Sequence, residues 1–241
     1  MNINTLYVTP AIGKTASRPK INLSAPWLFD MGFTPGALVQ ALPEPDGISF
    51  ILRDEYIMKY SDLYRITKEK GGALIIVNSS SNMEVTGKCI SNGGLDINDS
   101  LIALYGCGLI KARKLPANAR VVALNKDNHI VRLRGKWLTD FGFAPDAVVT
   151  AAIKPDSVTF KLQEKGIEDY RALVKQARED KEKVIQVHMD GYTQCIEVKA
   201  GFGACDAYIA ICEYGIIRAT PFYAEQLGFD KTRGLLPHYI E

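Results

Sequence analysis

The sequence lacks the features of a secreted, disulfide-bonded or membrane-spanning protein. Its five cysteines form no Cys-x-x-Cys pair and are odd in number, which favours buried reduced thiols over disulfides or zinc ligands. The N-terminal segment has no basic stretch followed by an apolar one, so no secretory signal is predicted. No apolar run approaches the roughly 18 residues that suggest a membrane span. We therefore expect a cytoplasmic protein that does not associate with membranes.

The sequence also lacks a large net charge and any recognisable catalytic motif. The formal net charge of the 241 residues is only +2, which neither requires nor excludes a polyanionic partner. The three histidines, His129, His188 and His238, lie in unrelated surroundings, and no P-loop, G-x-G-x-x-G or Ser/His/Asp pattern is present. Nucleic-acid hydrolysis needs an acid–base pair or a carboxylate–metal cluster. The sequence therefore predicts no catalytic residue, no metal and no cofactor.

What the sequence does contain is a long internal repeat. The segment Ile21–Leu52 aligns without gaps on Val131–Leu162, and the only two tryptophans, Trp27 and Trp137, are partners in this alignment. A weaker similarity continues to the end of each copy. The chain is therefore a tandem duplication, and each copy has a front and a rear module. The predicted boundaries are 1–54 (front) and 55–116 (rear) in the first copy, and 117–163 (front) and 164–241 (rear, with a C-terminal tail) in the second.

The front module has the pattern of strand, short helix, strand, turn, strand. Segments such as "KINLS" alternate apolar and polar residues, as half-buried strands do. Gly32 and Gly142 stand where a short helix needs a left-handed stop, and "PEPDG" and "KPDS" are turn sequences. The rear module is predicted as one helix, at about 58–70 and 167–181, followed by three strands. These patterns predict an α+β fold.

A module of this size cannot bury its own apolar face without help from a disulfide, a metal or a partner. The most direct partner for one front module is the other front module. We therefore expect the two front modules to pair within the chain into one barrel-like core, flanked by the two rear modules.

The front module resembles SymE-type proteins. The shared pattern is Pro-x-Ile-x-Leu-Ser-x-x-Trp-Leu-x-x-x-Gly-Phe-x-x-Gly-x-x-Val, which the first copy matches from Pro19 to Val39. The second copy matches less completely, because Arg134 replaces Ser24 and Asp146 replaces the turn glycine Gly36. The resemblance covers about 35 residues per copy and leaves out the rear modules. It implies a swapped-hairpin β-barrel similar to that of AbrB and MazE, formed here inside one chain.

The resemblance also implies a function, namely DNA binding through basic residues of paired hairpins that contact the phosphate backbone. A SymE-type toxin activity, with RNA cleavage proposed, is a further implication of the family that the residues support least. The first prediction is a non-catalytic DNA-binding protein, acting as a regulator or nucleoid-type factor. The alternative is a protein-binding module, such as an antitoxin-like, anti-defence or assembly factor. RNA as a ligand and association into a homo-oligomer remain open.

Local charge supports phosphate contact around the junction between the copies. From Lys111 to Lys136 the chain has eight basic residues against a single acid, Asp127. Phosphate neutralisation by such residues supplies most non-specific affinity for nucleic acid. The alternative is that they are solvated charges of an exposed strand. The predicted nucleic-acid-binding residues are Arg120, Lys126, Arg132, Arg134 and Lys136 near the second copy, and Lys14, Arg18 and Lys20 before the first.

Other repeated residues have ordinary structural explanations. Asp99 and Asp206 precede apolar segments, where turn or capping bonds explain them better than catalysis does. Trp27 and Trp137 could stack on bases. Their apolar neighbours favour a buried helix face instead.

Overall fold

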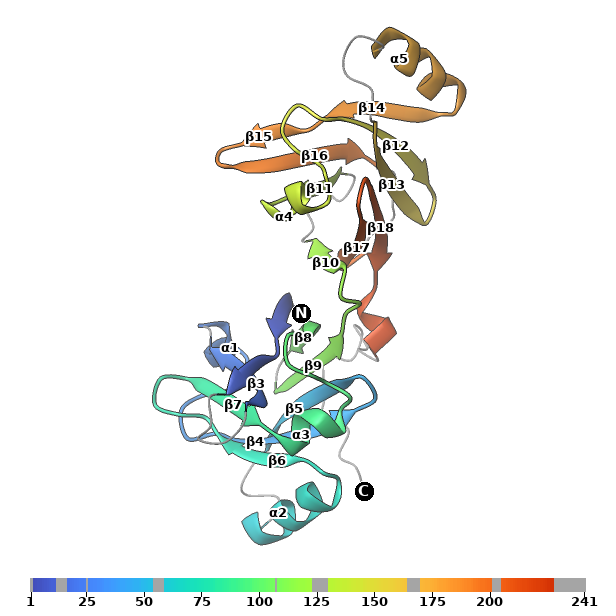
Figure 1. The fold of residues 1–241 in the computed structure, drawn as a ribbon. Helices are drawn as coiled ribbons and strands as arrows, with labels where there is room; N and C mark the ends of the chain where they lie inside the picture. The colour runs from blue at the N-terminus through green and yellow to red at the C-terminus, as the bar shows by residue number, and fades with distance from the viewer. Residues whose placement is uncertain are drawn as a thin grey trace. The chain divides into compact units, whose positions relative to one another are not determined.

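The computed structural model describes residues 2–11, 17–24, 26–53, 59–106, 108–122, 130–163, 170–200 and 205–227. The chain is an α+β protein, as predicted; its sheets are antiparallel, and it divides into two compact units (Figure 1). Unit 1 is Met1–Ala117 together with Ala224–Glu241, and unit 2 is Asn118–Tyr223. Within the described residues no helix is both long and apolar enough to cross a membrane.

Unit 1 contains a six-stranded sheet in the order β1-β8-β9-β5-β4-β6 and a three-stranded sheet in the order β2-β3-β7. The 3-10 helix Ala224–Leu227 also belongs to this unit. In chain order the elements of the first copy are β1 (Asn2–Tyr7), β2 (Thr9–Ala11), β3 (Arg18–Ser24), α1 (Trp27–Asp30), β4 (Leu38–Glu44), β5 (Gly47–Arg53), α2 (Tyr60–Glu69), β6 (Ala73–Ile76), β7 (Asn82–Thr86), α3 (Lys88–Asn92), β8 (Ser100–Gly106) and β9 (Leu109–Lys114).

Unit 2 repeats this plan with a sheet in the order β10-β17-β18-β13-β12-β14 and a second sheet in the order β11-β16-β15. Its elements are β10 (Ala119–Val122), β11 (Ile130–Arg134), α4 (Trp137–Asp140), β12 (Val148–Lys154), β13 (Ser157–Leu162), α5 (Tyr170–Glu179), β14 (Glu182–Gln186), β15 (His188–Asp190), β16 (Thr193–Lys199), β17 (Ala207–Glu213) and β18 (Ile216–Phe222).

The predicted elements of the front module are confirmed in both copies. The short helices α1 and α4 end at Asp30 and Asp140, and two residues later stand Gly32 and Gly142, which both have φ of 90°. In each copy the next residue, Phe33 or Phe143, donates its backbone N–H to the carbonyl at the helix start, that of Leu28 or Leu138. A glycine adopts this left-handed conformation without steric cost. The phenylalanine side chain is thereby turned into the core, where both copies are fully buried.

The rear modules have more structure than predicted. In the first copy the helix α2 is followed by four strands and the additional short helix α3, and in the second copy five strands follow α5. The prediction of three strands was wrong because long apolar stretches such as Leu101–Cys107 hid where a strand begins and where a hairpin turns. The helices themselves lie within the predicted ranges.

The rear module of the first copy repeats the architecture of its own front module. A shift of 62 positions, 100 minus 38, carries β4 onto β8, and it also carries β3, α1 and β5 approximately onto β7, α3 and β9. Backbone hydrogen bonds obey the same shift. Leu52 N–H donates to Gly108 O at 2.8 Å, and Lys114 N–H donates to Asp46 O at 2.7 Å. Unit 1 therefore has an approximate internal two-fold symmetry.

The two modules of a unit exchange strands across this symmetry. In unit 1 the front strand β1 pairs with the rear strand β8, and the rear strand β6 pairs with the front strand β4. The two hairpins meet through β5 and β9. Unit 2 has the same exchange: β10 pairs with β17, β14 with β12, and β13 with β18.

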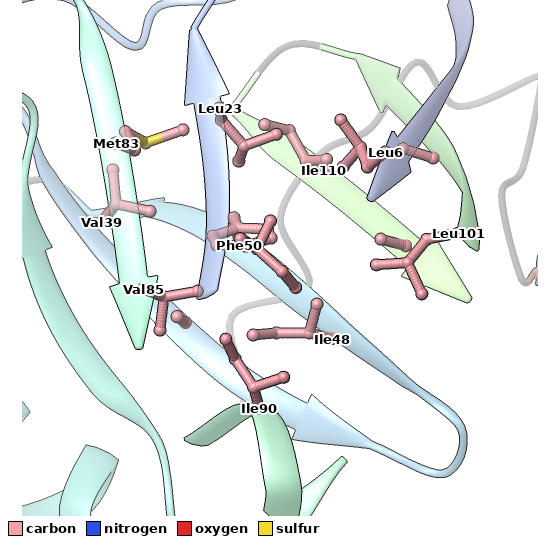
Figure 2. Packing of buried hydrophobic residues seen from close by; sticks show 14 of the residues in the cluster. Leu6, Leu23, Val39, Ile48, Phe50, Met83, Val85, Ile90, Leu101 and Ile110 are labelled. Atoms are coloured by element: carbon pink, nitrogen blue, oxygen red, sulfur yellow. The ribbon is translucent and has the colours of Figure 1, made fainter. Parts of the chain in front are cut away.

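The expected pairing of the two front modules with each other is wrong. All sheets of the described residues are built from strands of one copy, and they form no closed barrel. Each copy has its own core: one contains Leu23, Ile48 and Phe50 (Figure 2), the other Leu133, Val158 and Phe160. Each front module does pack against a partner, which is the rear module of the same copy. The similarity of this rear module to the front module is too faint to see in the sequence.

Four of the five cysteines, Cys89, Cys195, Cys205 and Cys212, are buried reduced thiols, as predicted, and Cys107 lies outside the described residues. Burial raises the pKa of Cys89 and of Cys212 to about 11, from an ordinary value of 9.0.

We expect stability to fall in alkaline solution because of these thiols. A group whose pKa is higher in the folded state stabilises the fold below its unfolded pKa, and this contribution is lost as the pH rises through the folded value. Urea unfolding should therefore show a free energy that declines between pH 9 and pH 11, by about 1 kcal/mol or more per thiol. The Cys212→Ala variant should show a shallower decline than the parent. Equal declines for both proteins would contradict this assignment.

Candidate nucleic-acid interface

The structure describes six of the eight basic residues predicted to contact phosphates, and three of these six are ion-paired. Lys14 and Lys126 lie outside the described residues. Among the others, Arg18 and Lys20 are on β3, Arg120 is on β10, and Arg132 and Arg134 are on β11. Lys136 immediately precedes α4 and is exposed.

The two arginines of β11 are paired with carboxylates of the neighbouring strands. Arg132 lies opposite Glu197 in the β11–β16 ladder, and its Nε is 2.7 Å from Glu197 Oε2. This hydrogen bond is the main reason why the pKa of Arg132 is raised. The Nε of Arg134 is 3.2 Å from Asp190 Oδ2 and also donates to Thr193 Oγ1 at 3.0 Å. A phosphate approaching either guanidinium would meet these carboxylates as well.

The first copy repeats this neutralisation. Lys20 Nζ is 3.4 Å from Glu84 Oε2. Glu84 lies opposite Asn22, just as Glu197 lies opposite Arg132, so both copies place a glutamate at the same point of the three-stranded sheet.

The half-buried Arg120 of the second copy donates from Nη1 to the carbonyl of the adjacent Ala119 at 3.0 Å. Of the predicted residues that the structure describes, only Arg18 and Lys136 are exposed and have no ion pair to a described acid.

A different set of cations lies on the face of the six-stranded sheets that points away from the core clusters. In β9, Ile110 and Ala112 point into the core cluster, so Lys111 and Arg113 lie on the opposite face, beside the buried Leu104 and Ile102 of β8; Arg113 is exposed and Lys111 is half-buried. In unit 2, Ile217 and Ala219 of β18 and Phe160 of β13 are core residues, so Arg218 and Lys161 point outward. We call Lys111, Arg113, Lys161 and Arg218 the sheet-face cations.

Two of the sheet-face cations, Lys111 and Arg218, hold equivalent places in the two units. Lys111 lies opposite Ser49, and Arg218 lies opposite Thr159. In unit 2 a shift of 59 positions, 207 minus 148, carries β12 onto β17 and β13 approximately onto β18. The two residues of each pair are therefore also related by the internal symmetry of their unit, because 49 plus 62 is 111 and 159 plus 59 is 218. Each local two-fold axis therefore passes beside a cation. No described carboxylate forms an ion pair with any of these four side chains.

The sequence carried a signal for these residues that a count of charges missed. The run Leu109–Lys114 alternates apolar Ile110 and Ala112 with Lys111 and Arg113, which marks the two basic residues as lying on one face of a strand. Arg218 alternates with Ile217 and Ala219 in the same way. Clustering along the chain pointed instead to β11, where the acids that neutralise the arginines come from other strands.

The outer face of unit 2 is also partly apolar. Ile211 and Ile216 are exposed on β17 and β18 beside Arg218, and Tyr214 in the turn between these strands is 79% exposed. The exposed Glu213 lies opposite Ile216, at the end of the β17–β18 hairpin. The face can therefore make both ionic and apolar contacts.

The tryptophans line the cores and are not free platforms for bases. Trp27 packs against the core of unit 1 and stacks on Tyr105, with ring centroids 3.8 Å apart. Trp137 packs against the core of unit 2 and donates from Nε1 to Arg134 O at 3.1 Å. A side chain at Gly135 would come within 2.6 Å of the Trp137 indole, so this orientation depends on glycine. At the equivalent position of the sequence the first copy has Ala25.

Two of the acidic residues singled out in the sequence have structural roles in the described part of the chain. Asp99 Oδ2 accepts a hydrogen bond from the backbone N–H of Asp96 at 2.7 Å and forms an ion pair with Lys114 Nζ at 2.8 Å. These contacts are the turn bonding expected from the sequence. Asp46 occupies the hairpin turn with a positive φ of 53°. No group of three His, Cys, Asp or Glu side chains that could hold a metal is found in the part of the chain that the structure describes.

Comparison with known proteins finds no matching family model, no matching curated protein and no matching solved structure. The fold and the placement of charge are therefore the basis for any statement about function.

Proposed function

We propose that this protein is a non-catalytic nucleic-acid-binding protein, with duplex DNA as its ligand, and that it contacts phosphates through the sheet-face cations. The observation that carries the proposal is the matched placement of Lys111 and Arg218, each beside the local two-fold axis of its unit and each without an ion pair to a described acid. Phosphate contacts need cations that are not already neutralised. The ion-paired residues of β11 do not meet this condition.

The symmetry of each unit suits such a ligand. A protein with two-fold symmetry can meet the two strands of a duplex in the same way, because a DNA duplex has local two-fold symmetry of its own. The exchange of strands between the modules of one unit supports the further proposal that each unit is a single-chain version of the swapped-hairpin architecture of AbrB and MazE. The chain would then carry two complete binding units in tandem.

We expect the Lys111→Ala/Arg218→Ala double variant to bind duplex DNA much more weakly than the parent. Each lost phosphate contact reduces the slope of log K against log salt by about 0.9, so the slope should flatten by about two and affinity at 100 mM salt should fall by roughly 50-fold. Fluorescence anisotropy with a labelled duplex across a salt series measures both quantities.

The matched control removes the same charge elsewhere. Arg132→Ala/Arg134→Ala takes away two cations that are ion-paired, and it should leave the salt slope unchanged. If this control flattens the slope and the sheet-face variant does not, phosphate contact lies on β11. If neither DNA nor RNA binds the parent at low salt, the nucleic-acid proposal is wrong.

A second candidate function is binding of a protein with an acidic surface. The exposed Ile211, Ile216 and Tyr214 beside Arg218 favour it, since aromatic residues and arginine are enriched at protein interfaces. An Ile211→Ser/Ile216→Ser variant separates the two candidates. Its DNA affinity should equal that of the parent, whereas capture of a protein partner through this face should be lost.

A further inference from the structure

We propose that the open edge of β6 is an interface that pairs with β6 of a second copy of this chain. β6 ends the six-stranded sheet of unit 1, and its only strand partner among the described residues is β4. A strand edge of this kind presents unpaired N–H and C=O groups that can accept another strand.

The composition of β6 leaves this edge unprotected. Its residues are Ala73, Leu74, Ile75 and Ile76, with no charge and no proline, and Ile76 is 62% exposed. Natural proteins normally guard exposed edges with charged side chains, proline or bulges. An unguarded apolar edge therefore indicates a strand that is covered in the working protein.

The second repeat of the same chain, in unit 2, allows a direct comparison. β14 occupies the same edge in unit 2, because it pairs with β12 as β6 pairs with β4. There, Lys183 stands in the place of Ala73 and Gln186 in the place of Ile76, and both are exposed. The β14 edge thus carries polar and charged side chains that protect an exposed strand, whereas the β6 edge at the equivalent place does not.

The edge of β6 can pair with β6 of a second molecule of the same protein. In an antiparallel pair centred on Ile75, residues directly opposite must lie on the same face of the sheet. Ile76 of one molecule would then lie beside Leu74 of the other molecule. Both side chains are on the same face of the sheet, opposite Leu38 and Gln40 of β4. Neither strand carries a charge that repels the other, and a symmetric pair of this kind is the commonest form of homodimer. With four residues on each side, the contact is small and the dimer is weak.

Sedimentation equilibrium of the full chain over a wide concentration range tests the proposal. The parent should approach twice the chain mass of 26.6 kDa as concentration rises. The Ala73→Lys/Ile76→Gln variant, which copies the guards of β14, should remain monomeric at the same concentrations. Tyr192→Ser removes a side chain that is 93% exposed in unit 2, and this control should dimerise like the parent.

Hydrogen exchange adds a readout at the edge itself. Backbone amides of β6 should gain protection on concentrating the parent but not on concentrating the guarded variant. A parent that stays monomeric at every concentration, or a guarded variant that dimerises as well as the parent, would overturn the proposal. Circular dichroism and a thermal melt of the guarded variant establish that it is folded, so that loss of the dimer is assigned to the edge.

Discussion

Replacing Phe160 by alanine should strongly destabilise unit 2 and leave the stability of unit 1 unchanged. Phe160 is fully buried in the core of unit 2, and removing such a ring costs about 3–5 kcal/mol. That loss is a large part of the roughly 5–15 kcal/mol that stabilises a whole domain. Because the core of unit 1 contains no residue of this cluster, its own transition should stay where it is.

Each unit has its own fluorescent reporter. The chain has two tryptophans, Trp27 in unit 1 and Trp137 in unit 2. In a Trp27→Phe background, urea unfolding followed at Trp137 should show the transition of Phe160→Ala moved to much lower urea; in a Trp137→Phe background, the Trp27 signal should not move. Phe50→Ala, at the equivalent place in unit 1, should give the reverse result. Equal shifts at both tryptophans would mean that the two copies share one core after all.

Gly47→Ser should destabilise unit 1 by about 2–4 kcal/mol, even though serine is the native residue at the equivalent place in unit 2. A Cβ at Gly47 would lie 2.4 Å from the carbonyl oxygen of Ala112 on the paired strand β9, so the β5–β9 contact would have to open. This contact joins the front and rear hairpins of the unit. Urea unfolding followed at Trp27 measures the effect.

Ser157 explains why the second copy tolerates a side chain there. The β13–β18 ladder begins at Val158, opposite Ala219, so Ser157 lies outside it, whereas Gly47 is paired with Arg113 inside the β5–β9 ladder. Ser157→Gly is the matched control and should change the stability of unit 2 by less than about 1 kcal/mol. A Gly47→Ser protein as stable as the parent would show that β9 moves away without cost.

The parts of the fold that could be predicted were those with a local cause. Gly32 and Gly142 stop a helix through their own backbone conformation, and alternating residues mark β3 and β11 as half-buried strands. The partner of each hairpin was not predictable in this way. β5 and β9 resemble each other as apolar hairpin strands, but nothing in either sequence says that they pair, because the register depends on contacts between residues about 60 positions apart.

The candidate interface shows the same division between local and distant causes. The basic character of Arg132 and Arg134 is visible in the sequence, but Glu197 and Asp190, which neutralise them, come from β16 and β15 far along the chain. Only the pairing of strands reveals that these charges cancel. For Lys111 and Arg218, by contrast, the strand alternation alone indicates an outward side chain.

The exchange of strands between modules has a consequence for how the chain reaches its native state during synthesis. A front hairpin leaving the ribosome has to wait for about 60 further residues before its partner exists, which takes roughly 3–12 s at cellular rates of translation. During that interval, its uncovered edge is open to a similar hairpin from another molecule. The order of the modules limits the risk within one chain: the proper rear partner of the first front module emerges before the competing front module of the second copy is made.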